Sequence, residues 1–176
     1  MRARRRWLWA GAGVLVVAAI VGGVFAARDR GGSPSFGRAS GKQVELSGRS
    51  PITGEQVDLA AYRGKLVVLN IWASWCTGCR EEARDLAKLA EAHPEAQVIG
   101  LDTQDNDGDA RAFYRQFGWS HPSVRDPGGS KAAELGLQGL PTTVFLDADH
   151  REAARIIGAT DREGFEQGLK AAKAAS

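Results

Sequence analysis

The fold is decided by residues 66–80, which read Leu-Val-Val-Leu-Asn-Ile-Trp-Ala-Ser-Trp-Cys-Thr-Gly-Cys-Arg. The first half of this stretch is an almost unbroken run of aliphatic, β-branched and aromatic side chains, which predicts a strand buried on both faces. A helix is expected from about 77 to 92, because a His-Pro pair follows and disfavours its continuation. The chain has two cysteines, Cys76 and Cys79, and both therefore lie where a buried strand passes into a helix.

Structural and metal-binding interpretations of the cysteine pair are weak. As a structural disulfide, so small a ring contributes about 2 kcal/mol through loop closure, against about 4.7 kcal/mol for a hundred-residue loop. A zinc site needs four ligands, and the remaining candidates, His93, His121 and His150, are scattered along the chain. Haem attachment needs a histidine directly after the second cysteine, where this chain has Arg80.

Thiol–disulfide exchange suits the position of the pair. Two cysteines three residues apart at a helix start have Cα atoms within disulfide-forming distance, so dithiol and disulfide interconvert with little backbone movement. Unpaired N–H groups and the helix dipole favour a thiolate there, with pKa values of about 3.5–7.5 instead of about 8.5. We predict that Cys76 is the attacking nucleophile and that Cys79, one turn further in, resolves the mixed disulfide.

An acidic residue interrupts the apolar face of the predicted helix. That face carries Cys79, Leu86 and Leu89, and Glu82 falls within it. A carboxyl group that faces a core responds with a raised pKa, which suits a group passing protons to and from Cys79. We predict this role for Glu82; the alternative is that its side chain only reaches the edge of the apolar face.

Strand-like and helix-like segments alternate through the rest of the chain. We expect further strands at 98–101, 142–146 and 153–157, and further helices at 109–117, 130–135 and 162–174. Residues 44–46 and 56–59 flank Pro51 and Gly54, which predicts a short hairpin ahead of the first core strand. The alternation predicts an α/β sandwich around a central sheet.

The N-terminal residues predict a membrane segment. Residues 7–27 contain no charged side chain, and as a helix they would span about 31 Å, against about 30 Å of bilayer hydrocarbon. Four arginines precede the run, so the positive-inside rule keeps the N-terminus in the cytoplasm and sends the remainder across. We expect an uncleaved single-pass anchor and an extracytoplasmic domain; the alternative is a cleaved signal peptide and a secreted domain.

Charge and composition divide the chain into three parts. Residues 1–30 carry six arginines and one aspartate, a local charge of +5, so the total of +2 leaves −3 for the remainder. The folded part therefore offers no basic surface to nucleic acid. Residues 28–42 are rich in Gly, Ser and Arg without apolar periodicity, which is typical of a linker. The expected parts are a signal-anchor at 1–27, a linker at 28–42 and one domain at 43–176.

Two motifs resemble those of a known family. Residues 72–80 read Trp-Ala-Ser-Trp-Cys-Thr-Gly-Cys-Arg after a buried strand, and they resemble the active site of extracytoplasmic thioredoxin-like proteins of the TlpA and ResA type. Residues 139–143, Gly-Leu-Pro-Thr-Thr, resemble the cis-proline loop of the same family. The resemblance covers about residues 43–170. It implies a thioredoxin-like three-layer sandwich with a mixed central sheet, here with the hairpin as an N-terminal extension and a single transmembrane helix.

The resemblance also implies roles for particular residues. Leu140-Pro141 would form a cis peptide beside the disulfide and help to bind extended substrate chains; the alternative is a trans proline at a strand start. Trp75 would shield the nucleophile and contact substrate, although plain core packing is its alternative. In the ResA-like group the buried acid comes from the helix, at the position of Glu82. Cytoplasmic thioredoxins instead carry a buried aspartate where this chain has Asn70.

This chain departs from the family pattern at two positions. Arg84 stands where the family helix usually has a kinking proline, so we expect a straighter helix. His150 occupies a turn position where glycine is usual, so a non-glycine residue must adopt that turn.

The expected activity is dithiol–disulfide exchange with no bound cofactor and no metal. The resemblance implies a reductant of secreted or membrane protein thiols, with apocytochrome c before haem attachment as one substrate and a membrane thiol-electron donor as partner. The alternative within the class is an oxidant that introduces disulfides. Alternatives from other classes are a peroxiredoxin-type peroxidase and a copper-delivery module that uses both thiols with His121 or His150.

Overall fold

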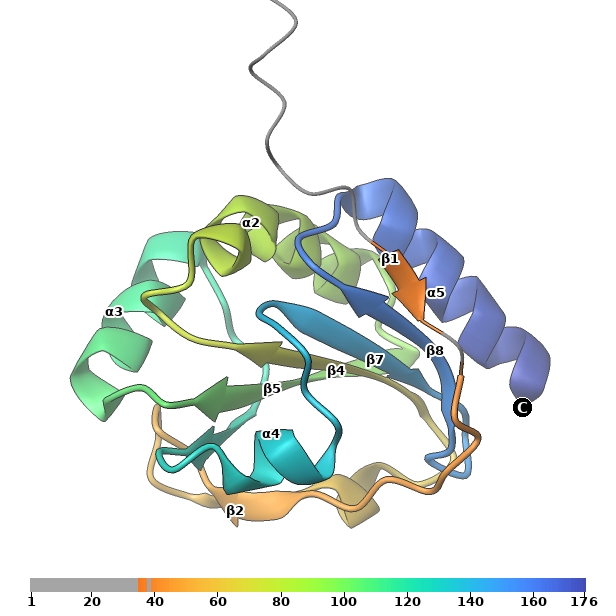
Figure 1. Ribbon diagram of the computed structural model, residues 1–176, viewed down its shortest axis with the longest axis horizontal. Helices are drawn as coiled ribbons and strands as arrows, with labels where there is room; N and C mark the ends of the chain where they lie inside the picture. The colour runs from red at the N-terminus through yellow and green to blue at the C-terminus, as the bar shows by residue number, and fades with distance from the viewer. Residues whose placement is uncertain (1–34, 38) are drawn as a thin grey trace, which may run out of the picture. The chain divides into compact units, whose positions relative to one another are not determined.

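The structure is a computed structural model that describes residues 35–37 and 39–176. At its centre is a six-stranded mixed sheet in the order β1-β8-β7-β4-β5-β6 (Figure 1). The strands are β1 (Ser35–Gly37), β4 (Leu66–Trp72), β5 (Ala96–Thr103), β6 (Ser123–Asp126), β7 (Thr142–Leu146) and β8 (Glu152–Ile157). β5 is parallel to β4 and β6, whereas β7, β8 and β1 are each antiparallel to their neighbours.

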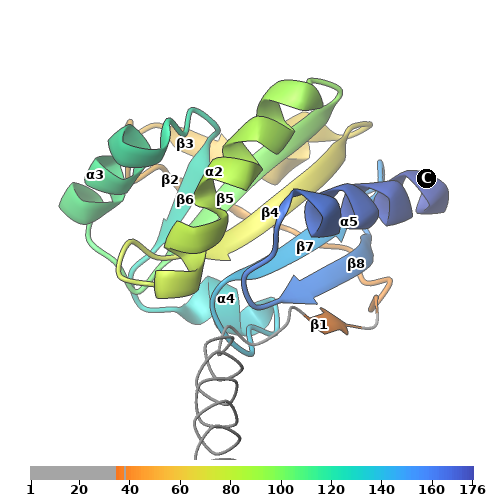
Figure 2. The same cartoon turned by 90° about the horizontal axis from the view of Figure 1, so that it is seen from above.

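Helices and a hairpin cover the sheet and give the domain three layers (Figures 1 and 2). The helices on the first face are α2 (Thr77–Ala92), α3 (Asp107–Phe117) and α5 (Arg162–Ala175). The second face carries α4 (Ser130–Glu134), the 3-10 helix η1 (Leu59–Tyr62) and the hairpin of β2 (Ser47–Arg49) and β3 (Gln56–Asp58). Because β4–α2–β5 and β5–α3–β6 both join parallel strands by right-handed crossovers, α2 and α3 fall on the same face.

Two hydrophobic cores fill the spaces between the layers. On the first face, Leu86 of α2, Phe113 of α3 and Phe165 of α5 pack together. On the second face, Leu59 of η1 and Ala132 of α4 pack against the sheet. Both faces of the sheet are therefore shielded from water, as expected when helices and loops cover the two sides of a central sheet.

The central strand β4 determines where the site lies. Residues 67–72 are all buried, because β5 and β7 flank the strand and both faces are covered. Successive side chains alternate between the cores, with Trp72 in the first and Ile71 in the second. The chain leaves β4 at its carboxyl end and enters α2 within a few residues, at the edge where α/β sheets place their reactive groups.

The predicted α/β sandwich with a central mixed sheet is confirmed, with small differences at its edges. The hairpin is present, but its first arm is Ser47–Arg49 rather than 44–46. β1 and β6 are not predicted, because they are short edge strands without an apolar run. β1 falls inside the predicted linker, 28–42, so residues 35–37 of that segment are a strand that pairs with β8 instead.

The predicted signal-anchor at 1–27 lies outside the described residues. Within 35–37 and 39–176, no helix combines the length and hydrophobicity that crossing a bilayer requires. The membrane segment and the three-part division of the chain stay predictions.

Candidate active site

The two cysteines form a disulfide at the start of α2, beside the carboxyl end of β4. Cys76 is the N-cap residue of the helix, and its Sγ accepts a hydrogen bond from the Cys79 backbone N–H at 3.1 Å. The two Cα atoms are 5.2 Å apart, within the usual range for a disulfide. Cys76 is 5% exposed and Cys79 is 1% exposed, so the predicted resolving thiol is the deeper of the two.

The loop before β7 lies against the disulfide turn. The Leu140–Pro141 peptide is cis, as the resemblance implies. Gly78, between the cysteines, faces this loop: a Cβ atom at that position would lie 3.0 Å from Pro141 Cδ and 3.4 Å from Ala159 Cβ. A larger residue would push the loop away, so the glycine permits the close approach of the proline to the disulfide turn.

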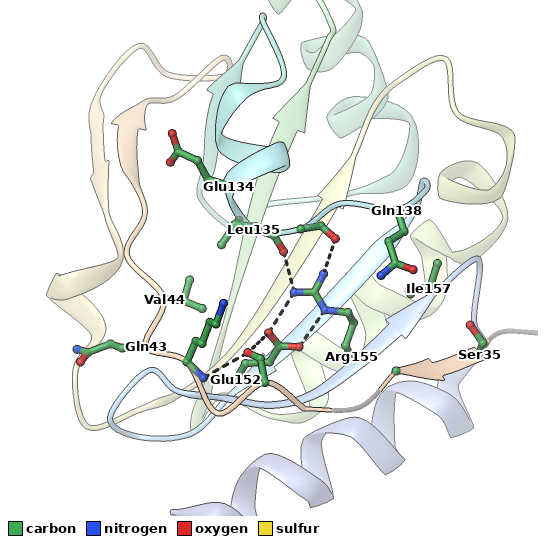
Figure 3. A pocket seen from close by; sticks show the side chains of 13 residues that line it. Ser35, Gln43, Val44, Glu134, Leu135, Gln138, Glu152, Arg155 and Ile157 are labelled. Atoms are coloured by element: carbon green, nitrogen blue, oxygen red, sulfur yellow. Dashed lines mark hydrogen bonds and ion pairs between the residues drawn. The ribbon is translucent and has the colours of Figure 1, made fainter.

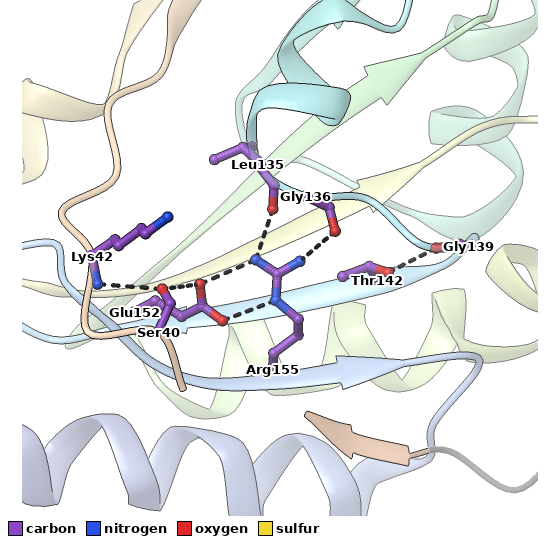
Figure 4. A network of polar contacts seen from close by, with 8 residues as sticks. All are labelled: Ser40, Lys42, Leu135, Gly136, Gly139, Thr142, Glu152 and Arg155. Carbon is purple, nitrogen blue, oxygen red and sulfur yellow. Dashed lines mark hydrogen bonds and ion pairs between the residues drawn. The ribbon is translucent and has the colours of Figure 1, made fainter. Parts of the chain in front are cut away.

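A polar network holds the connection that leads from α4 to the cis-proline loop (Figure 4). Arg155 on β8 donates to the carbonyl oxygens of Leu135 at 2.8 Å and Gly136 at 3.3 Å. Its guanidinium also donates to both carboxylate oxygens of Glu152, at 2.9 and 3.1 Å, and Ser40 donates to the same group at 2.7 Å. Burial alone would raise the pKa of Glu152, but these donors hold it below its ordinary value. Arg155 and Glu152 therefore neutralise one another, and the Arg155 guanidinium holds residues 135–136 by their carbonyl groups.

A groove of about 510 Å³ lies over this network (Figure 3). Its lining includes Ser35 of β1, Lys42 in the N-terminal segment and Gln138 in the connection to the cis-proline loop. The guanidinium and carboxylate on its floor already bind one another and the backbone, so the groove presents polar groups without a free buried charge.

Glu82 is 2% exposed, one turn beyond Cys79 in α2. Its Oε1 accepts a hydrogen bond from Asn70 Nδ2 at 2.8 Å, and its Oε2 accepts one from the Thr160 backbone N–H at 3.1 Å. Desolvation by burial raises the pKa of Glu82 to about 8, although both hydrogen bonds act to lower it. The helix runs unbroken past Arg84, and the predicted burial of Glu82 is confirmed. Its part in proton transfer stays a prediction.

Side chains hold the segment that precedes the nucleophile. The backbone N–H and the hydroxyl of Ser74 donate to the Asp105 carboxylate at 2.5 and 2.9 Å, and Arg80 donates to the Ser74 carbonyl at 3.2 Å. The Trp75 indole N–H donates to the Gln104 carbonyl at 3.0 Å. Trp75 is 58% exposed, so it does not pack in the core. Its ring is open to solvent at the rim of the site.

A second buried carboxyl group, which is not among the predicted site residues, lies below this segment. Asp102 in β5 is 2% exposed, and its Oδ1 has no hydrogen-bond partner among the described residues. Burial raises the pKa of Asp102 to about 8; Asp105 and Asp107 add to the effect, and Arg125 opposes it. The sequence held a signal for this group, because strand alternation places Leu101 in one core and turns its neighbour toward the other.

The structure does not bring the three histidines to the disulfide. His150 lies in the β7–β8 turn with φ at 61°, at the end of β7 away from Pro141. His121 is buried, and desolvation lowers its pKa to about 3. His93 caps the far end of α2 and pairs with two glutamates. Across the described ranges, no cluster of three or more His, Cys, Asp and Glu side chains could hold a metal ion.

The disulfide lies at the carboxyl end of a buried central strand, and a cis proline packs against the disulfide turn. These features place this chain among the thioredoxin-like thiol–disulfide oxidoreductases. Comparison with known proteins defines the family: residues 41–151 match the AhpC/TSA family, and the chain belongs to it. It is an enzyme of the thiol–disulfide oxidoreductase class, similar to proteins of the ResA and DsbE type.

Individual relatives agree with this assignment. The chain is 30% identical over 132 residues to the thiol-disulfide oxidoreductase ResA of Bacillus thuringiensis, covering 74% of this chain and 76% of that protein. It is 30% identical over 149 residues to the thiol:disulfide interchange protein HelX of Rhodobacter capsulatus, covering 82% and 84%. A solved DsbF homologue from Corynebacterium diphtheriae superposes with a TM-score of 0.69 at 31% identity, covering 81% and 94%.

Proposed function

We propose that this protein is a membrane-anchored, extracytoplasmic oxidoreductase that reduces disulfides in other proteins. The observation that carries the proposal is the order of three groups on α2. Cys76 is the N-cap, Cys79 lies one turn deeper, and Glu82 is buried one turn beyond it. This order supplies an outer sulfur to attack, an inner sulfur to resolve, and a nearby group to carry the proton.

The reaction follows from these positions. In the reduced protein the Cys76 thiolate, favoured at the helix N-terminus, attacks one sulfur of a substrate disulfide, and the other substrate sulfur leaves as a thiolate. Cys79 then loses its proton and attacks the Cys76 sulfur, which releases the second substrate thiolate. The substrate thiolates are protonated, so the substrate gains two electrons and two protons. The protein is left with the Cys76–Cys79 disulfide seen in the structure.

Glu82 is suited to move the proton of Cys79. Burial raises its pKa to about 8, close to the ordinary value of about 8.5 for a thiol. Proton transfer between groups of similar pKa is efficient in both directions, which a reversible exchange requires. Asn70 and the Thr160 N–H hold the carboxyl group in place without adding a charge.

Substrate chains would bind at the exposed edge of this site. Trp75 offers an open aromatic surface on one side of the disulfide turn, and the Leu140–Pro141 loop lies on the other. The Arg155 network fixes the connection to that loop, so the binding edge is rigid. An extended polypeptide that carries a disulfide fits between these two groups.

The proposed setting is the outer side of the cytoplasmic membrane. Support comes from the uncharged run at 7–27 with its preceding arginines. A domain so placed would receive electrons from a membrane thiol donor. Apocytochrome c is a suitable substrate, because its haem-attachment cysteines are separated by two intervening residues and must be reduced before haem binds.

Trapping experiments and a redox titration test the proposed reaction. Cys79→Ser should accumulate mixed disulfides with protein substrates, because the resolving thiol is gone, whereas Cys76→Ser should form none. In equilibrium with glutathione, the full chain should show a potential toward the reducing end of a range that spans roughly −270 to −120 mV. A value at the oxidising end would instead indicate a protein that introduces disulfides.

Labelling in intact cells tests the proposed location. After reduction, a membrane-impermeant maleimide should modify the full chain at Cys76, and the Cys76→Ser variant serves as the matched control. Modification only after the cells are lysed would contradict an extracytoplasmic domain and leave the exchange chemistry unaffected.

A further inference from the structure

Residues 73–75 join β4 to the nucleophile, and the β5–α3 connection holds them. The Asp105 carboxylate accepts both the backbone N–H and the hydroxyl of Ser74, while Arg80 donates to the Ser74 carbonyl from the other side. Because Ser74 lies two residues before Cys76, a movement of Asp105 would be passed along the chain to the attacking sulfur.

Asp102 lies beneath this contact, near the carboxyl end of β5. The strand register places it beside Trp72 of β4 and Arg125 of β6. The side chain is buried, and within the described part of the chain its Oδ1 meets no hydrogen-bond donor. An ionised carboxylate in such a position is unfavourable, so a proton on this group, donated to a neighbouring acceptor, is the arrangement the surroundings favour.

The charged and titratable groups around Asp102 come from three elements. Asp105 precedes α3, Asp107 and Tyr114 belong to α3, and Arg125 belongs to β6. Arg125 is an incomplete counter-ion, because it pairs with Asp107 at 3.4 Å and 43% of its side chain is exposed. Burial raises the pKa of Tyr114, which keeps its hydroxyl neutral. Burial first, and Asp105 next, raise the pKa of Asp102 to about 8.

We propose that Asp102 keeps a proton that it donates to Asp105, and that this carboxyl pair positions residues 74–75 ahead of the nucleophile. With the proton in place, the Asp102 hydroxyl donates to Asp105, and the remaining negative charge accepts the two Ser74 groups. Without it, two carboxylates face one another at a buried site, which is strongly unfavourable. Asp105 is only half-buried, so it turns toward solvent and releases Ser74. Both aspartates are positioning residues, because they act through Ser74.

The pair makes the geometry of the site depend on pH separately from Glu82. Exchange should slow in alkaline solution, because the segment before Cys76 loses its anchor as Asp102 ionises. This inference rests on the proposed function only in taking Cys76 as the nucleophile, and it is independent of the direction of electron flow.

The test follows Trp75 in the oxidised full chain, held in detergent micelles, where neither cysteine titrates. The Trp75 indole is hydrogen-bonded to Gln104 in the same connection, so its environment reports the position of the segment. 5-Fluorotryptophan is incorporated, and the Trp75 fluorine resonance is assigned with Trp75→Phe. We expect this resonance to titrate with a midpoint near the pKa of about 8 given above for Asp102. The titration should persist in Glu82→Gln and be absent in Asp102→Asn.

Three further variants guard against a change in folding and test the effect on exchange. Asp105→Asn keeps the buried carboxyl group but removes its charged partner, so the midpoint should move to lower pH. Asp85→Asn, which removes an acidic group from α2 away from the pair, should titrate like the wild type. Asp105→Ala should slow exchange roughly tenfold to a hundredfold, since a misplacement of about 1 Å can cost about 10²-fold.

Two results would overturn the inference: a Trp75 resonance that does not titrate, or a titration that is lost in Glu82→Gln and kept in Asp102→Asn. The proposed function fails separately. A wild-type protein without exchange activity, in which Trp75 still titrates through Asp102, would leave the carboxyl pair intact and refute the assigned reaction.

Discussion

Two buried carboxyl groups flank the disulfide turn, and their surroundings are opposite in kind. Glu82 accepts hydrogen bonds from a neutral amide, Asn70, and from a backbone N–H, with no charged partner within those contacts. Asp102 has an oxygen without a partner among the described residues, and the negative charges of Asp105 and Asp107 raise its pKa further. Burial nevertheless raises the pKa of both groups to about 8.

The difference shows that one pKa can arise in two ways. At Glu82, burial does all the raising, and the neighbours reduce its effect because they stabilise the anion. At Asp102, the acidic neighbours add to burial because they repel the anion. The first arrangement suits a group that gives and takes a proton freely. The second suits a group whose ionisation disrupts its surroundings. Changes to the neighbours should therefore shift the two groups in opposite directions.

The largest effect is expected when Glu82 itself is changed. Glu82→Gln removes the proton acceptor of Cys79 and should lower the exchange rate by about 10²–10⁴-fold, the range typical of general acid–base catalysis. Stopped-flow reduction of a protein disulfide across pH measures this. Glu81→Gln, at the exposed neighbouring position on the same helix, is the control and should retain the wild-type rate. An unchanged pH profile in Glu82→Gln would count against proton transfer by this residue.

A smaller effect is expected on the pH dependence of stability, and here the two groups should behave alike. Each carboxyl group has a folded pKa raised above its unfolded value, so its contribution is complete below about pH 4 and is lost as the pH rises through about 8. The unfolding free energy of the oxidised protein should thus fall across that window by up to roughly 5 kcal/mol for each group, since one pKa unit is worth about 1.4 kcal/mol.

Denaturant unfolding at the two ends of the window measures this loss. Glu82→Gln and Asp102→Asn should each flatten it by a similar amount. Any contribution from His93, whose pKa is raised by its hydrogen bonds to Glu95 and Glu166, is common to all three proteins and cancels in the comparison. A loss of stability that both variants retain in full would place the titrating groups elsewhere.

A third change would give Glu82 an acidic neighbour, as Asp102 already has. Asn70→Asp places a carboxyl group where a neutral donor now binds Glu82. The two acids should then share a proton. The pKa of Glu82 should rise by more than about one unit, because like charges repel in a buried site. Carbon-13 titration of the Glu82 carboxyl measures the shift. In Asn70→Ser, which adds no acid, the pKa of Glu82 should be lower than in Asn70→Asp. Equal pKa values in the two variants would contradict the role of the neighbouring charge.

The sequence predicted the first site better than the second for a physical reason. Glu82 interrupts a helical apolar face, and the periodicity of a long amphipathic helix marks such an exception clearly. Asp102 follows the apolar run 98–101 and looks like the polar end of a strand. Its burial depends on α3 folding back over β5, and its partner Asp105 belongs to a connection whose course no local pattern specifies.

The same distinction holds for the fold. The strand 142–146 was predicted with its observed bounds, because it is a short apolar run between clear turn signals. The cis peptide at Pro141 was implied by family resemblance and is confirmed. The edge strands β1 and β6 were missed, since each has one large apolar residue among small or polar ones and becomes a strand only by pairing with β8 or β5.

The smallest predicted effect comes from a cation beside Asp102. Arg125→Gln removes a group that lowers the pKa of Asp102 and leaves Asp107 without the ion pair at 3.4 Å. Both consequences raise the pKa of Asp102, but a side chain that is 43% exposed is screened by solvent, so the shift should be roughly a few tenths of a unit. Carbon-13 titration should show this shift at Asp102 and none at Glu82. A shift of equal size at Glu82 would mean that the two sites are not separate.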